Sequence, residues 1–221
     1  METEKDFTYT AHTGCVNTPD NSLESIDSGI MFNAQIVEID LNFSEKGEPL
    51  LSHNKPKGGE ITLENAFMRI SSYENLKVNI DVKNRRYLEK VPLLAKKYGI
   101  LDRIFFTGIE PEAADEVRTA CPNIPFYLNI DVLSAEEHNE EYLLSLVKIV
   151  KDKKAIGINF NKENASKELV DIFHKNNLLV SIWTVDKDED IYRILSYMPD
   201  NITTRRPDKL NEIKNKNFLN L

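Results

Sequence analysis

The chain has 221 residues, of which 41% are hydrophobic and 29% charged, a composition typical of a folded globular protein. Its formal net charge of −8 at pH 7 argues against nucleic acid as a general partner, because no basic surface is available to displace counterions from phosphates. The length suits one large domain, and since no linker or internal repeat is evident, we expect a single domain over residues 1–221.

Cysteine usage and apolar runs bear on the cellular compartment. The two cysteines, Cys15 and Cys121, form neither a disulfide framework nor a zinc motif, which fits a reducing environment. Residues 1–10 lack the apolar core of a signal peptide, and no apolar run reaches the ~20 residues of a transmembrane helix. We therefore expect a cytoplasmic protein without a membrane span, and the sequence leaves its oligomeric state open.

Short apolar, β-branched runs alternate with amphipathic stretches along the chain. The runs expected as strands are Phe7–Ala11, Gln35–Leu41, Lys77–Val82, Arg103–Thr107, Phe126–Ile130, Ala155–Asn159, Leu179–Trp183 and Asn201–Thr204, with a short additional run at Pro49–Ser52. The helices expected between them cover residues 22–33, 63–70, 86–98, 111–120, 135–150, 166–175 and 188–197, with a last helix from Asp208. This alternation indicates a parallel α/β protein.

Capping residues and prolines place the helix starts. Asn21 or Ser22 can cap the first helix, and Thr62 the second. Pro111 suits a first turn, whereas Pro92 lies inside the 86–98 stretch and is expected to shorten that helix from its N-terminal side. The alternation itself fits both a closed eight-stranded barrel and an open doubly wound sheet. No glycine-rich dinucleotide or phosphate-binding motif follows any strand, which weakens the open-sheet interpretation.

The expected strand Gln35–Leu41 carries two carboxylates on one face. Alternation puts Glu38 and Asp40 on the same side, about 7 Å apart, and the apolar residues on the other. A strand with one solvated face is the ordinary explanation. In a barrel both faces are covered, and two buried like charges are then costly without a cation.

The next expected strand repeats this arrangement, with Asn79, Asp81 and Lys83 on one face. The carboxyl ends of the strands are where a β/α barrel carries its active site. With the two carboxylates of the preceding strand, Asp81 completes three oxygen ligands, which suit Mg²⁺ or Ca²⁺, with Mn²⁺ as a further option, rather than zinc or copper. Three carboxylates, one divalent cation and Lys83 sum to zero charge.

Two of the four histidines, His12 and His53, follow expected strands. His138 and His174 lie within expected helices, where a surface imidazole is the ordinary interpretation. A single histidine after a strand is more often structural than catalytic. A pair beside a carboxylate cluster can do general acid and general base work near neutral pH.

In their order along the chain, these residues resemble the glycerophosphodiester phosphodiesterases, a family of β/α barrels. The family motifs His-Arg-Gly, Pro-Glu-Asn-Thr, Glu-Leu-Asp, His-Asp, Thr-Leu-Glu and Glu-x-Lys are similar to His12–Gly14, Pro19–Ser22, Glu38–Asp40, His53–Asn54, Thr62–Glu64 and Asp81–Lys83. Its later motifs Trp-Thr-Val-Asn and Ile-Thr-Asp-x-Pro are similar to Ile182–Val185 and Ile202–Pro207. Each motif alone is weak, but the ordered set spans nearly the whole chain.

The resemblance implies a single eight-stranded β/α (TIM) barrel that hydrolyses small-molecule glycerophosphodiesters to glycerol 3-phosphate and an alcohol. It assigns acid–base catalysis to His12 and His53, and the binding of one divalent cation to Glu38, Asp40 and Asp81. Lys83 would face a phosphate oxygen. Trp183 would form an apolar wall at the mouth of the site, or alternatively close the barrel as a core aromatic.

The departures from the family pattern also carry predictions. Thr13 occupies a substrate-binding position where the family has an arginine, and supplies neither its charge nor its bidentate geometry. Asp81 is one methylene shorter than the family glutamate. Arg205 or Arg206 either restores positive charge near the phosphate or forms a salt bridge elsewhere. The short segment 54–61 lacks the usual insertion after the second strand, which predicts a shallow, open site.

Three functions therefore stay open. An active phosphodiesterase is favoured by the retained histidines and carboxylates. A catalytically weakened barrel that binds a phosphorylated ligand or a partner is favoured by Thr13. The third is a related chemistry that stops at a cyclic phosphate or releases a lipid headgroup.

Overall fold

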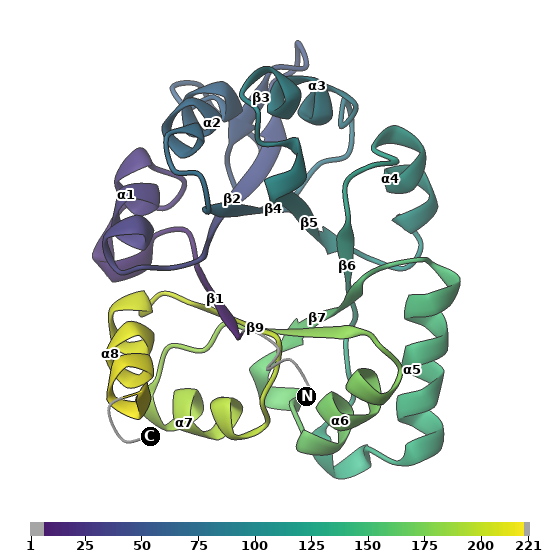
Figure 1. Ribbon diagram of the computed structural model, residues 1–221. Helices are drawn as coiled ribbons and strands as arrows, with labels where there is room; N and C mark the ends of the chain where they lie inside the picture. The colour runs from purple at the N-terminus through teal and green to yellow at the C-terminus, as the bar shows by residue number, and fades with distance from the viewer. Residues whose placement is uncertain (1–6, 219–221) are drawn as a thin grey trace.

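The computed structural model describes residues 7–218. Eight parallel strands within this range form a closed ring (Figure 1). The ring is formed by β1 (Thr8–Ala11), β2 (Ile36–Phe43), β4 (Lys77–Val82), β5 (Ile104–Ile109), β6 (Phe126–Asn129), β7 (Gly157–Asn161), β8 (Leu179–Trp183) and β9 (Asn201–Thr204). Strand β1 pairs in parallel with both β9 and β2, which closes the ring. The barrel is thus confirmed and the open sheet excluded. The ends of the expected domain, residues 1–6 and 219–221, lie outside the described residues.

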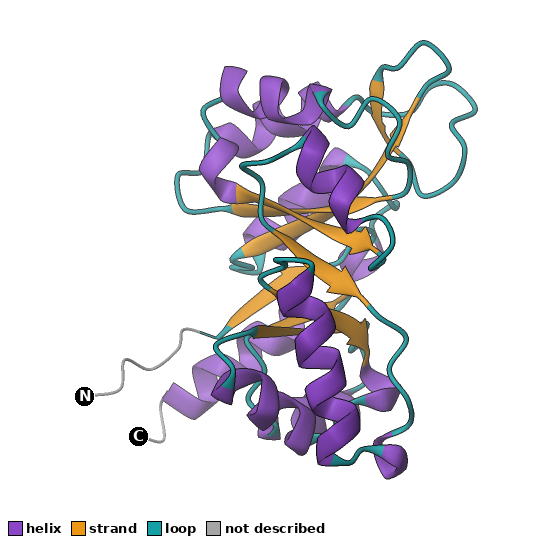
Figure 2. Cartoon of the chain, turned by 90° about the vertical axis from the view of Figure 1, so that its right-hand side faces the viewer, coloured by secondary structure: helices purple, strands orange, loops and turns teal. Residues whose placement is uncertain are grey.

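Helices surround this ring on its outer side, and Figure 2 shows the strands in the middle of the molecule with helices on either side. They are α1 (Leu23–Met31), α2 (Leu63–Ser71), α3 (Lys90–Lys97), α4 (Ala114–Ala120), α5 (Glu140–Asp152), α6 (Lys167–Lys175), α7 (Asp188–Ser196) and α8 (Pro207–Phe218). Within residues 7–218, no helix is both long and apolar enough to cross a membrane.

The capping predictions explain two of the helix starts. The hydroxyls of Ser22 and Thr62 accept hydrogen bonds from the backbone N–H groups three residues on, as predicted for α1 and α2. Helix α3 begins later than its sequence pattern suggests, at Lys90. Tyr87 has a left-handed φ of 69°, which no helix accommodates, and Pro92 then fits the first turns.

A short strand and a direct return follow β2. Strand β3 (Pro49–Leu51) pairs antiparallel with β2 and lies outside the parallel ring. Residues 54–61 then lead back to a bridge between Leu50 and Thr62, immediately before α2. The segment that follows His53 therefore contains no helix or strand of its own, as its shortness predicts.

The two faces of β2 are both buried, but by different surroundings. Val37, Ile39 and Leu41 belong to the apolar core between the strands and the outer helices. Glu38 and Asp40 point to the other face and are only 6% and 3% exposed. The interpretation of this segment as a strand with one solvated face is therefore wrong, since the barrel interior covers its polar side.

Polar side chains from other strands also line the interior and form hydrogen bonds with one another. The Asn201 amide accepts a hydrogen bond from Thr10 at 3.0 Å and donates one to Ser181 at 3.0 Å. Thr107 donates to Asn79 at 2.8 Å. Because these buried groups satisfy one another, the interior can stay polar up to the carboxyl ends of the strands.

Candidate functional site

A cavity of about 500 Å³ lies at the carboxyl ends of the barrel strands. It is lined by His12, Glu38, Asp40, His53, Asn79, Asp81, Val82, Lys83, Arg85, Thr107, Gly108, Glu110, Asn129, Asn159, Trp183, Thr184, Thr203 and Arg205. Seven of the eight site residues predicted from the sequence are therefore brought together here. Thr13 is the exception.

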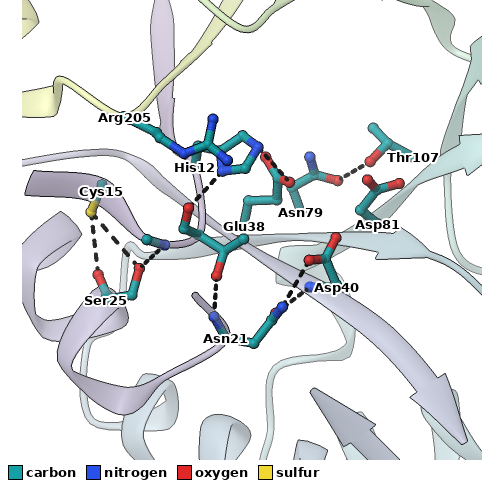
Figure 3. Close-up of polar contacts among 12 residues, drawn as sticks. His12, Cys15, Asn21, Ser25, Glu38, Asp40, Asn79, Asp81, Thr107 and Arg205 are labelled. Carbon is teal, nitrogen blue, oxygen red and sulfur yellow. Dashed lines mark hydrogen bonds and ion pairs between the residues drawn. The ribbon is translucent and has the colours of Figure 1, made fainter. Parts of the chain in front are cut away.

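The three predicted carboxylates form one cluster. Glu38 and Asp40 come from β2 and Asp81 from β4, and the parallel register places Asp40 directly beside Asp81. One oxygen from each of the three lies within 4.8 Å of the others. Figure 3 shows all three side chains directed toward the same space.

Burial and mutual repulsion make this cluster electrostatically costly. Burial, followed by the charges of Asp81 and Asp40, raises the pKa of the Glu38 carboxyl well above its usual range. The Lys83 ammonium lies 2.6 Å from Asp81 Oδ2 and 3.2 Å from Asp40 Oδ1. Burial by itself would lower the pKa of Lys83, but the two carboxylates raise it overall. One lysine thus balances part of a site with three carboxylates.

A second observation indicates that the carboxylates could bind a divalent cation. Asp81 Oδ1 is buried and has no hydrogen-bond partner among the described residues. An unpaired buried carboxylate oxygen is costly unless an ion or water completes it. A set of three carboxylate oxygens suits a hard cation such as Mg²⁺ or Ca²⁺. Glu38, Asp40 and Asp81 would hold that ion.

Asn21 positions one of these carboxylates, a role that the sequence did not reveal. Its Nδ2 donates to Asp40 Oδ2 at 2.8 Å, and its Oδ1 accepts from the Asp40 backbone N–H at 2.9 Å (Figure 3). Its own φ is 56°, a left-handed conformation that asparagine tolerates better than most residues. The only available signal was its place in the Pro19–Ser22 motif.

His12 enters the cavity with a defined tautomer. Its Nδ1–H donates to the Thr13 carbonyl oxygen at 2.6 Å, because a carbonyl only accepts, and Nε2 lies 3.8 Å from Glu38 Oε1. Burial lowers the pKa of His12, and the charge of Arg205 acts in the same direction. The Nε2 atom is therefore left as an acceptor at the cavity.

His53 and Thr13 lie in different surroundings. His53 is exposed at the cavity edge after β3, and no hydrogen bond involves its ring within residues 7–218. The Thr13 side chain is buried and accepts from the Asn21 backbone N–H, away from the cavity lining. The predicted substrate contact of Thr13 finds no support in this placement, because its hydroxyl is already used to hold the loop.

Trp183 is half-buried in the cavity wall at the end of β8. Its Nε1 is buried without a hydrogen-bond partner among the described residues. The same wall carries amide side chains: Asn159 donates to Asn129 Oδ1 at 3.2 Å, and Gly108 N–H donates to the same oxygen at 2.9 Å. The wall opposite the carboxylates is thus polar but uncharged at these positions.

The remaining histidines lie away from the cavity. His138, in the segment before α5, bonds to the Ser166 hydroxyl at 2.7 Å and to the Leu133 carbonyl oxygen at 3.0 Å. His174, in α6, bonds to Asp200 at 2.9 Å. Neither lines the cavity. Both are half-buried rather than surface imidazoles, and His138 lies outside any helix.

Solved structures resemble this fold over nearly its whole length. A phosphodiesterase from Oleispira antarctica, in complex with the product sn-glycerol-3-phosphate, has a TM-score of 0.78 at 16% identity and is covered to 95%, with 93% of this chain. A glycerophosphodiester phosphodiesterase from Parabacteroides distasonis has a TM-score of 0.78 at 17% identity, with 96% of this chain and 98% of that one covered. One from Thermotoga maritima has a TM-score of 0.74 at 18% identity, with 94% and 98% covered. At such identities the likeness establishes the barrel.

Sequence comparison gives the family. The comparison with curated proteins found no match. Residues 59–209, more than half of the chain, match the description "Glycerophosphoryl diester phosphodiesterase family". That range contains Asp81, Lys83 and Trp183, whereas the motifs around His12 and Glu38 precede it. The chain belongs to the glycerophosphoryl diester phosphodiesterase family and is a phosphoric diester hydrolase.

Proposed function

We propose that this chain hydrolyses glycerophosphodiesters to glycerol 3-phosphate and an alcohol. The observation that carries the proposal is the carboxylate cluster, with its unpaired Asp81 Oδ1, beside the Nε2 acceptor of His12 in one cavity. The glycerol 3-phosphate complex of the Oleispira antarctica phosphodiesterase supports the choice of product.

In this proposal Glu38, Asp40 and Asp81 hold one divalent cation, Mg²⁺, Ca²⁺ or Mn²⁺. When bound, such a cation supplies a Lewis acid that stabilises negative charge on the phosphoryl oxygens. Lys83, which is paired with Asp81 and Asp40, also faces a phosphate oxygen of the substrate. Trp183 forms the apolar wall against the carbon chain of the substrate.

The two histidines divide the proton transfers. His12 takes the proton of a substrate glycerol hydroxyl as that oxygen attacks phosphorus, because its Nδ1 hydrogen bond leaves Nε2 as the acceptor. His53, exposed at the cavity edge, gives a proton to the departing alcohol oxygen. Water then opens the cyclic phosphate, with each histidine reversing its role. The two steps together consume one water and regenerate both histidines.

The partner, the domain organisation and the cellular location of this protein are also predictions. We propose a small-molecule substrate as the partner, a single-domain protein, a cytoplasmic location and no binding to nucleic acid, the last because of the net charge of −8.

Two histidine variants test the acid–base assignment. His12→Ala and His53→Ala should each reduce release of glycerol 3-phosphate from glycerophosphocholine and glycerophosphoethanolamine by about 100-fold or more, the size of a general acid–base contribution. His138→Ala is the control, because His138 does not line the cavity. Near-normal turnover by a folded His12→Ala or His53→Ala would contradict the role of that residue. A folded wild-type protein that binds cation but hydrolyses neither substrate would favour the binding role instead.

A further inference from the structure

Binding of a substrate phosphate in this cavity calls for a positively charged side chain, and Thr13 does not supply one. The inference drawn from this rests on the proposed function. A phosphodiester anion bound beside three carboxylates requires positive charge on its other side. Thr13 is uncharged, buried, and outside the cavity lining. We propose that Arg205, at the end of β9, is the residue whose guanidinium binds the phosphate group of the substrate.

Two of the three Lys and Arg side chains that line the cavity are already engaged. Lys83 is paired with two carboxylates at 2.6 and 3.2 Å. Arg85 is paired with Glu116 at 3.0 Å and Glu110 at 3.6 Å. Arg205 has only one ion pair within residues 7–218, at 3.9 Å to Asp186, and its side chain is 43% exposed. It is therefore the cation most available to a ligand.

The position of Arg205 is also suited to the reacting group. Strand β9 pairs with β1, so that the residues after each strand, Arg205 and His12, are neighbours. Figure 3 shows the Arg205 guanidinium beside the His12 ring, on the side of the cavity that holds Glu38. A phosphate that contacts His12 and the carboxylate cluster is then within reach of this side chain.

The backbone of Arg205 is held by hydrogen bonds on both sides of its peptide unit. Its N–H donates to Asp186 Oδ1 at 2.7 Å, and its carbonyl oxygen accepts from the Val16 N–H at 2.9 Å. Thr204 adds a hydroxyl bond to the same Asp186 oxygen at 3.3 Å. The guanidinium thus starts from a fixed point, which limits the conformational entropy lost when it closes on a phosphate.

The next residue in the chain provides a matched control. The Arg206 guanidinium pairs with both oxygens of Asp208 at 3.0 to 3.3 Å and does not line the cavity. It carries the same charge at nearly the same exposure, 45% of the side chain. An effect of charge alone would appear in both arginine variants, whereas phosphate contact would appear only at position 205.

Calorimetric titration of the metal-loaded protein with glycerol 3-phosphate and with inorganic phosphate tests the inference. Arg205→Gln should weaken both ligands by about 10- to 100-fold, the size of a charge-assisted contact, while Arg206→Gln stays within about twofold of wild type. Arg205→Lys should be intermediate, since it keeps the charge but not the bidentate geometry. In turnover, Arg205→Gln should raise KM at least as strongly as it lowers kcat.

The outcomes separate this inference from the proposed function. Turnover by the wild type, together with unchanged phosphate affinity in Arg205→Gln, overturns the role of Arg205 and leaves the function standing. Absence of turnover, together with phosphate binding that Arg205→Gln loses, supports the role of Arg205 and contradicts the function. Equal losses in the two glutamine variants would mean a general charge effect and overturn the inference.

Discussion

Gly108 leaves the space that Asp81 occupies. It lies in β5 at an irregularity of the register between Phe106 and Ile109, with a left-handed φ of 72°. A Cβ atom added there would lie 2.3 Å from Asp81 Oδ1 and 2.8 Å from the Val82 carbonyl oxygen. Gly108→Ala therefore perturbs the proposed cation site through one carboxylate, without removing any ligand.

Two effects of this substitution can be estimated. A non-glycine residue in the left-handed region costs about 1–2 kcal/mol of stability. The carboxylate oxygen must also move by about 1 Å to restore normal contact, far beyond the ~0.2 Å tolerance of metal–ligand distances. We expect the affinity for Mg²⁺ or Ca²⁺ to fall by about 10-fold or more, the size of effects seen when support around a metal site is lost.

Substitution of Gly99, which follows α3, is the control that separates backbone strain from displacement of the Asp81 carboxylate. Its φ is 67°, close to that of Gly108, but no atom lies within 4 Å of its added Cβ. Urea unfolding in chelator should show a loss of about 1–2 kcal/mol for Gly99→Ala and a larger loss for Gly108→Ala, because the Cβ added at position 108 also meets the backbone of Val82. Calorimetric titration with cation should show weaker binding for Gly108→Ala alone. If all three proteins bind the cation equally well, Asp81 does not ligate it in the way the structure indicates.

Three further predictions concern the carboxylate cluster. Lys83→Met should lower the stability of the metal-free protein by about 3 kcal/mol, because it leaves buried carboxylates unpaired. Added cation should recover part of the lost stability, and an unchanged urea midpoint in chelator would contradict this prediction. Asp81→Asn should weaken cation binding measured by calorimetry, and wild-type affinity would remove Asp81 from the ligand set. Cation at 100 times its Kd should stabilise the wild-type protein by about 2.7 kcal/mol; a melting temperature that chelator does not lower would refute a bound ion.

Local patterns predicted the strands and the cluster because their determinants are close in sequence. The alternation around Glu38 and Asp40 and around Asp81 placed these side chains on single strand faces, and the parallel register then brought the two strands together. Ser22 and Thr62 marked helix starts through contacts three residues away. Such features can be predicted from the sequence because they depend on residues only a few positions apart and not on contacts between distant segments.

Other features depend on contacts between distant segments. Closure of the barrel requires β1 to pair with β9, a contact of Thr8 with Asn201 that no local pattern contains. The supporting roles of Asn21 and Gly108 exist only because the loop that carries Asn21 meets β2 and because β5, which carries Gly108, pairs with β4. The sequence left open whether Arg205 or Arg206 lies near the phosphate or forms a salt bridge elsewhere, since the distance of Arg205 from His12 is set by that same strand pairing.

The most direct test of the account is phosphorus NMR of metal-depleted protein with glycerophosphocholine, before and after addition of Mg²⁺, Ca²⁺ or Mn²⁺. We expect no reaction in chelator, conversion of the diester signal to glycerol 3-phosphate after cation is added, and loss of that conversion in Asp81→Asn and His12→Ala. Equal conversion with and without chelator, or by Asp81→Asn at the wild-type rate, would contradict a cation-dependent reaction at this cluster.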